Sequence, residues 1–181
     1  DIARASAFRY ALGYADGLAR EYDVDREELR AYAQANCRGL HGIARAFGVF
    51  EHMNGRSDNG GESEARAAMI LAGVVAPELQ VEIARPGNAG YYLADYGWRM
   101  PDGSWMLAEL HGLGKFEDET QKDLEHAAAK TYRAALLRDA NLRAMGHNVI
   151  HFKLSDTYDV EEFGAMMRGY GIPTTKPFAD S

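Results

Sequence analysis

The chain has 181 residues, of which 46% are hydrophobic and 26% charged, a composition that excludes a disordered tail and fits a folded domain with a core. Its net charge of -7 argues against a protein that coats nucleic acid nonspecifically, because phosphate binding needs a positive surface. The longest apolar run, residues 67–76, is shorter than the roughly 20 residues that a membrane-spanning helix needs, and no signal segment opens the chain. We therefore expect a cytoplasmic protein with no membrane contact.

The first part of the chain is predicted to be helical. Apolar residues recur at helical spacing over residues 3–22, and Asp25 followed by Glu28 is typical of a capping box that opens a second helix. A third helix is expected over residues 41–53. Because the helical pattern is already under way at the first residue, we expect the helical region to continue from a part of the protein that lies upstream.

Glycine, asparagine and other polar residues predict a loop after the third helix. We place a boundary there, with a helical region over residues 1–56 and an α/β domain over residues 57–181. The single cysteine, Cys37, excludes an intramolecular disulfide and a multi-cysteine zinc site, and it is consistent with a reducing compartment.

The second part of the chain alternates between helical and strand patterns. In chain order we expect a helix over 62–74, strands over 79–85, 91–98 and 105–111, a long helix over 122–145, a strand over 148–153 and a helix over 158–170. Turn residues at 86–88 and 101–104 predict that the first three strands form an antiparallel meander. The fold class is thus α/β, a mixed four-stranded sheet flanked by helices.

Two carboxylates on neighbouring expected strands form the centre of the candidate site. Asp95 interrupts an apolar strand, and a charge in such a position needs a partner or a metal ion. Glu109 lies on the next strand, and the turn between the strands allows both side chains to point to one face of the sheet. Oxygen ligands placed in this way suit Mg²⁺ or Mn²⁺, which would activate water for phosphodiester hydrolysis.

A second pair of candidates follows Glu109. His111 is two residues further along the strand, a spacing that returns a side chain to the same face. Nuclease sites usually carry lysine at this third position, where the cation orients the attacking water. Lys115 follows from a glycine-bracketed loop, so His111 and Lys115 are both candidates for the role. The spacing is common on exposed strands and has little specificity by itself.

Short segments in a fixed order give the chain a family resemblance. They are Gly61-Glu62-Ser63-Glu64-Ala65-Arg66, Pro77-Glu78-Leu79-Gln80-Val81, Asp95, Glu109-Leu110-His111-Gly112-Leu113-Gly114-Lys115-Phe116, and Arg138-Asp139-Ala140-Asn141-Leu142 with Gly146. Over roughly residues 62–152 the chain resembles actinobacterial proteins with a domain similar to the very-short-patch repair endonucleases. In these proteins the domain often follows a helical region and an N-terminal winged helix of the AbiEi antitoxin type.

The resemblance implies a PD-(D/E)XK nuclease-type αβββαβ core. In such a core Glu62, Asp95, Glu109 and His111 would line the site, with Lys115 nearby. DNA would be the substrate and Mg²⁺ or Mn²⁺ the cofactor. Gln80 would lie near this site and contact nucleic acid. The predicted helix over 122–145 is locally basic, so Lys130, Arg133 and Arg138 are also expected to contact nucleic acid, through its phosphate backbone.

The chain departs from its apparent relatives at Leu110, where they show an aromatic residue, and at three histidines. His111 replaces an expected carboxylate, His147 replaces tryptophan and His151 replaces arginine. Because an imidazole supplies one negative charge fewer than a carboxylate, we expect a retained fold with weakened catalysis.

We therefore expect a metal-dependent DNA endonuclease-like domain, and two other interpretations stay open. A degenerate nuclease fold would serve as the regulatory half of a toxin-antitoxin or transcription-regulator protein, with DNA bound by an upstream winged helix. A protein-binding module is the third interpretation. A cation captured between Asp95 and Glu109 would favour the enzyme, whereas a salt bridge from either carboxylate to Arg or Lys would favour the regulator. Glu62 has a simpler interpretation as an acidic residue in the first turn of a helix.

Overall fold

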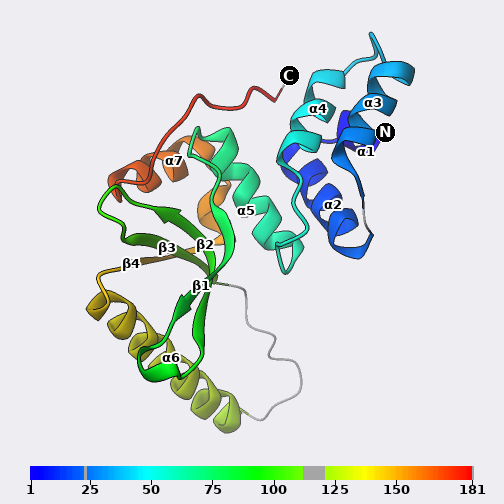
Figure 1. Cartoon of the computed structure of the whole chain (residues 1–181). Coiled ribbons are helices and arrows are strands. Elements are labelled where there is room, and N and C mark those ends of the chain that lie inside the picture. Colours follow the sequence, from blue (N-terminus) through cyan, green and yellow to red (C-terminus); the bar gives the residue numbers. More distant parts are fainter. Residues whose placement is uncertain (23, 112–120, 181) are drawn as a thin grey trace. The chain divides into compact units, whose positions relative to one another are not determined.

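The computed structural model describes residues 1–22, 24–111 and 121–180, without the side chains of residues 88 and 121–131. These residues contain seven α-helices and a mixed four-stranded sheet (Figure 1), which confirms the expected α/β class. The chain divides into two compact units. Unit 1 consists of Asp1–Leu79 and Leu154–Ser181, and unit 2 of Gln80–Lys153. The expected boundary after residue 56 lies inside unit 1.

Unit 1 is helical. Its helix α2 packs against α4 and α5, and the buried side chains at this junction include Phe8, Leu12, Val49 and Ile70. The elements of the unit are α1 (Ile2–Ala5), α2 (Phe8–Glu21), α3 (Arg26–Asn36), α4 (Ile43–His52), α5 (Gly60–Leu71), the short 3-10 helix η2 (Leu154–Thr157) and α7 (Val160–Gly169).

Side-chain caps fix where several of these helices begin. The Asp25 carboxylate accepts a hydrogen bond from the Glu27 N–H at 2.7 Å, so the second expected helix begins where the capping pattern indicated. The Asn59 side chain accepts from the Glu62 N–H at 3.0 Å and starts α5 in the same way.

The pattern over residues 3–22 predicted one helix, whereas the structure has two. At Ser6 the backbone is extended, with ψ at 154°, and α1 ends. The guanidinium of Arg45 donates to the Ser6 carbonyl at 3.3 Å, and the Phe8 N–H donates to the Asp180 carboxylate at 3.0 Å. These contacts from distant parts of the chain satisfy the backbone groups at the break, and helical periodicity does not encode them.

A buried ion pair joins α2 to α5. Arg66 Nη2 lies 2.7 Å from both carboxylate oxygens of Asp16, and the two side chains are 4% and 0% exposed. Asp16 also accepts from the Asn54 N–H at 2.7 Å, and Arg66 donates to the His52 carbonyl at 2.7 Å. Both charges are therefore paired and hydrogen-bonded, as burial requires.

Unit 2 is built on the sheet. The strands are β1 (Glu78–Ala84), β2 (Tyr91–Arg99), β3 (Trp105–His111) and β4 (Asn148–Lys153), and they lie in this order. Strand β3 pairs with β2 antiparallel and with β4 parallel. The connection from β1 to β2 through the 3-10 helix η1 (Pro86–Asn88) is too short for a parallel crossover, so these strands form a hairpin (Figure 1). The first three strands thus form the expected meander.

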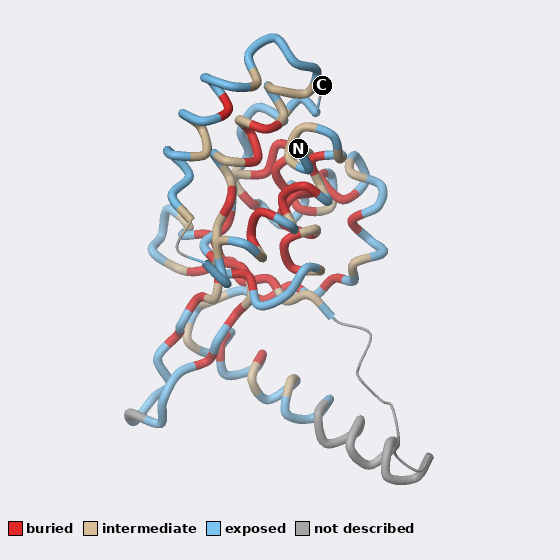
Figure 2. Tube along the Cα trace, turned by 90° about the vertical axis from the view of Figure 1, so that its right-hand side faces the viewer, coloured by how far each residue is buried: buried red, intermediate tan, exposed pale blue. Residues whose placement is uncertain are grey.

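Helix α6 (Gln121–Ala144) crosses from β3 to β4 and covers one face of the sheet (Figure 1). Leu142 of α6 is fully buried in a cluster with Val81, Leu107 and Val149. Most of the described part of α6 is exposed or intermediate in Figure 2, and Tyr132 is 67% exposed. Within the described residues no helix is long and apolar enough to span a membrane.

We predict that Asp16→Ala lowers the free energy of unfolding by about 3–5 kcal/mol, because it leaves the Arg66 charge buried without its partner. Urea unfolding followed by circular dichroism measures the change. Arg26→Ala is the matched control, since the Arg26 side chain is 59% exposed and 4.0 Å from Glu27. The control should shift the free energy by less than about 0.5 kcal/mol, and an equally small shift for Asp16→Ala would contradict the prediction.

Candidate functional site

The two candidate carboxylates lie on neighbouring strands. The paired register of β2 and β3 runs from Arg99 opposite Trp105 to Tyr96 opposite Ala108, and one further step sets Asp95 opposite Glu109. The Asp95 carboxylate accepts a hydrogen bond from the Leu110 N–H at 2.8 Å, so its side chain lies against β3 next to Glu109. The sheet therefore brings the two carboxylates together.

An arginine from α6 holds Glu109. Arg138 donates through Nη2 to the Glu109 carboxylate and, at 2.6 Å, to the Leu93 carbonyl on β2. The Glu109 side chain is 14% exposed and that of Arg138 is 26% exposed. Glu109 is thus engaged by a cation that the protein itself supplies, in a partly buried setting that strengthens the interaction.

The pKa of Glu109 reflects opposing influences. Burial raises the pKa most, and the Asp95 charge raises it further by repulsion. The hydrogen bond and charge of Arg138 lower the pKa, as does His151, but the net direction is upward. The acidic pair is therefore strained by desolvation and like charge, and Arg138 only partly offsets this cost.

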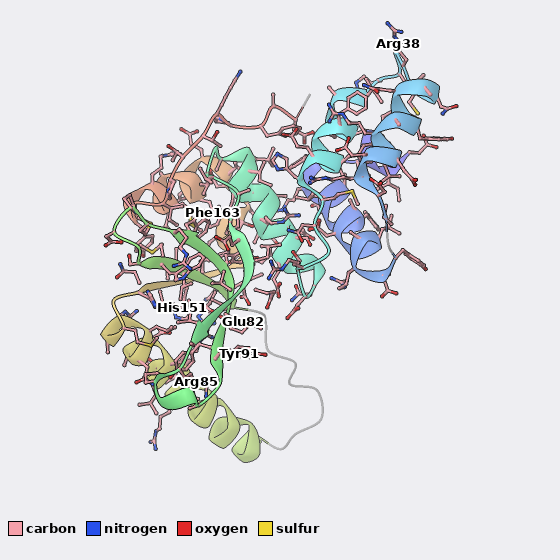
Figure 3. All side chains as sticks on the ribbon, in the orientation of Figure 1. Arg38, Glu82, Arg85, Tyr91, His151 and Phe163 are labelled. Carbon is pink, nitrogen blue, oxygen red and sulfur yellow. The ribbon has the colours of Figure 1, made fainter. Side chains whose placement is uncertain are left out.

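A second set of polar contacts lies beside the acidic pair. His151 on β4 projects toward α6 (Figure 3), where its Nε2 lies 2.7 Å from Asp139 Oδ2. Arg143 approaches the same carboxylate at 3.6 Å. On the sheet, the His111 ring stacks on the His151 ring with centroids 4.7 Å apart. One residue after Arg138, the helix thus makes an independent polar contact with the sheet.

Asn141 adds a further contact between helix and sheet, donating to the Tyr92 hydroxyl at 2.8 Å. We call Arg138, Asp139, Asn141 and Arg143 the polar seam of α6. Arg143 also donates to the Val149 carbonyl at 3.3 Å. The described contacts of the helix with the sheet are therefore made by hydrogen bonds as well as by Leu142.

The arrangement does not fit a divalent cation well. The described residues contain no group of three or more His, Cys, Asp or Glu side chains that could hold a metal ion. Asp95 and Glu109 supply two oxygen-bearing groups, but the Arg138 guanidinium already lies on Glu109. A cation placed there would meet this positive charge, which opposes binding.

Of the remaining predicted site residues, Glu62 lies in unit 1 and others lie outside the described residues. Glu62 belongs to unit 1, where its carboxylate accepts from the Asp58 N–H at 2.8 Å and from the Asn59 side chain at 2.7 Å, next to the start of α5. This agrees with its simpler interpretation as a residue of the first helical turn. Lys115 lies outside the described residues, and so does the Lys130 side chain.

The expected nucleic-acid contacts are also separated by the structure. Arg138 points to the sheet rather than to solvent, whereas Arg133 is exposed. Gln80 lies in β1 with a φ of 53°, the one positive value for a non-glycine residue in the described part of the chain. Such a value often marks a local irregularity in a strand. Of these residues, Arg138 contacts the acidic pair, through Glu109.

Sequence reasoning missed the pairing of Asp139 with His151. The only signal was chemical: an acid stands in the helix next to Arg138, and a histidine stands in the final strand where relatives were expected to carry arginine. Arginine and histidine can both pair with the Asp139 carboxylate, so His151 keeps a partner for it. The motifs that contain Asp139 and His151 do not reveal this pairing when each is considered alone.

Comparisons with known proteins give limited help. No family model and no solved structure matches the chain. Two proteins from two strains of Mycobacterium tuberculosis, both described as uncharacterised, are each 34% identical over 98 residues. The match covers 54% of this chain and 35% of each relative, so the chain spans about a third of the length of these relatives.

We predict that Asp95→Asn lowers the pKa of Glu109, because it removes the repulsion, and that Arg138→Gln raises it. Carbon-detected NMR titration of the Glu109 carboxyl measures both shifts. A raised pKa means that the folded protein binds this proton more tightly than the unfolded chain. The resulting stabilisation of the folded protein is complete at pH values below the pKa of Glu109 in the unfolded chain. It is lost as the pH rises through the pKa of Glu109 in the folded protein. Asp95→Asn should make this loss of stability smaller. Unchanged values in both variants would contradict the prediction.

Proposed function

We propose that unit 2 is a nuclease-type domain that works without catalysis, as the regulatory, effector-binding half of a DNA-binding protein of the toxin-antitoxin or transcription-regulator kind. The observation that carries the proposal is the ion pair between Glu109 and Arg138. Because the Arg138 guanidinium neutralises the charge of Glu109, this carboxylate acts as a structural partner of Arg138. It is therefore poorly suited to bind a catalytic cation.

The distribution of basic residues supports the same proposal. The chain carries a net charge of -7, and Arg138 is engaged with the sheet instead of being presented to a phosphate backbone. Of the expected nucleic-acid contacts, Arg133 is the basic residue whose described side chain is exposed. We therefore assign DNA binding to another part of the full-length protein, for which an upstream winged helix is our hypothesis.

A weak Mn²⁺- or Mg²⁺-dependent endonuclease is the second candidate. It is favoured by the position of Asp95 beside Glu109 and by the raised pKa that their repulsion helps to produce. This activity requires Arg138 to leave Glu109, so that both carboxylates become available as oxygen ligands. Lys115 and His111 remain the residues proposed to position water in that case.

We predict that the protein does not cleave double-stranded or single-stranded DNA above background with either Mg²⁺ or Mn²⁺ at millimolar concentration. A gel assay with a labelled duplex and its separate strands measures cleavage. The matched control is Asp95→Asn, which removes one carboxylate of the pair and keeps a side chain of similar size. Equal, background-level products from both proteins support the regulatory proposal.

Cleavage that depends on Mn²⁺ and disappears in Asp95→Asn would overturn the regulatory proposal in favour of the endonuclease. Cleavage that persists in Asp95→Asn would indicate a contaminating nuclease. The contaminant would then be removed by further purification, and the assay repeated.

A further inference from the structure

The segment that follows α7 runs across the helices of unit 1 (Figure 1), and we call its residues 173–180 the strap. We propose that the strap occupies a peptide-binding groove of unit 1. The same groove would take a segment of a partner protein in which an aromatic residue is followed two positions later by a carboxylate. The groove belongs to unit 1, so its role goes beyond the function proposed for unit 2.

Phe178 is the aromatic anchor of the strap. Its ring lies against the Phe8 ring, with centroids 4.4 Å apart, and meets the His52 ring edge-on at 6.2 Å. The Phe178 N–H donates to the Ile70 carbonyl at 3.3 Å. The ring therefore packs against the apolar cluster that α2, α4 and α5 share. Ring pairs of this kind are stabilised beyond the burial of their area.

Gly48 of α4 forms the floor of the groove beneath this ring. The three atoms nearest to a Cβ added at Gly48 all belong to the Phe178 ring, and that Cβ would overlap the ring. The backbone of Gly48 has no positive φ that would require glycine. Glycine inside a helix is less stable than alanine. Space for the anchor of the strap is thus a structural reason for glycine at this position.

Asp180 supplies the acidic end of the strap. Its carboxylate accepts from the Phe8 N–H at 3.0 Å and pairs with the Arg45 guanidinium. The N-cap residue of α2, Ala7, provides no side-chain cap, and the first turn of α2 contains no acidic residue. The free helix start and the arginine therefore form a carboxylate-binding end of the groove.

Most of the strap is held weakly. Residues 173–180 are exposed apart from Pro173 and Phe178, which are partly buried. Main-chain hydrogen bonds at residues 173, 175 and 178 join the strap to the rest of unit 1. A segment with few buried contacts opens at a low cost in free energy. The groove can therefore exchange the strap for another segment without unfolding of the helices.

The strap does not fill the groove. A cavity of about 370 Å³ lies beside residues 175–179, and its other walls include Glu51, His52 and Val74. This volume falls in the range of ligand-binding sites. A partner segment with more bulk than the strap can therefore be accommodated.

The test uses the full chain and a fluorescein-labelled peptide with the sequence of residues 173–180. Phe178→Ala removes the anchor of the resident strap, so the peptide no longer competes with a ligand tethered to the same chain. We expect the peptide to bind Phe178→Ala roughly tenfold or more tightly than the unaltered protein, as measured by fluorescence anisotropy. Thr174→Ala is the matched control, because Thr174 is an exposed strap residue. Its affinity for the peptide should equal that of the unaltered protein.

Two further changes assign the binding to the groove. Gly48→Ala fills the space of the anchoring ring, so adding it to Phe178→Ala should abolish the gain in affinity. A peptide with alanine in place of its phenylalanine or its aspartate should lose the gain as well. Equal affinity of Phe178→Ala and the unaltered protein, a gain that survives Gly48→Ala, or full binding of either altered peptide would overturn the proposal.

If Phe178→Ala melts too low for titration, Asp180→Ala replaces it, since this change leaves the Phe178 ring in place. Hydrogen exchange of the Phe8 amide, followed by NMR, should be faster in Asp180→Ala and slow again when the peptide is added at millimolar concentration. Exchange that the peptide does not slow would overturn the proposal. A dimer of the unaltered protein with exchanged straps, detected by sedimentation and lost in Phe178→Ala, would overturn it in favour of a second copy as the occupant.

Discussion

Two carboxylates on adjacent strands repel each other, and partial burial makes that repulsion more costly than it is in water. Asp95 and Glu109 are in this position, and the pKa of Glu109 is raised, mainly by its burial and further by the Asp95 charge. A sheet that places such a pair side by side requires positive charge from outside the sheet. In unit 2 this charge comes from Arg138 of α6.

In each unit an arginine from a helix neutralises a buried or partly buried carboxylate, but the two arginines differ in their surroundings. The Arg66 side chain is almost completely buried and donates to both carboxylate oxygens of Asp16, so it is a fixed part of the core. Arg138 is about a quarter exposed and shares its guanidinium between a carboxylate and a main-chain carbonyl. An exposed counter-ion can be exchanged for another at lower cost than an enclosed one, because water compensates part of the lost interaction.

The sequence predicted the sheet well because the relevant signals are local. Turn residues such as Asp102 and Gly103 mark the end of β2 and the beginning of β3, and alternating apolar residues indicate β1. The break at Ser6 and the partner of Arg138 could not be predicted in the same way. Both depend on groups far along the chain, and helical spacing shows which side chains share a face without showing what that face meets. The two carboxylates were found because charge inside an apolar strand is itself a local signal.

The parallel pairing of β3 with β4 has a consequence for how the chain folds. The β2–β3 hairpin closes across a short turn, whereas β4 reaches β3 only after the whole crossover that contains α6. Loop-closure entropy therefore favours early hairpin formation and late addition of β4. Until β4 arrives, one side of β3 is an open edge of unpaired backbone groups that carries Trp105 and Leu107. This edge offers a nascent chain a surface for strand pairing with other chains, so the interval before the crossover closes is when unit 2 is most prone to aggregation.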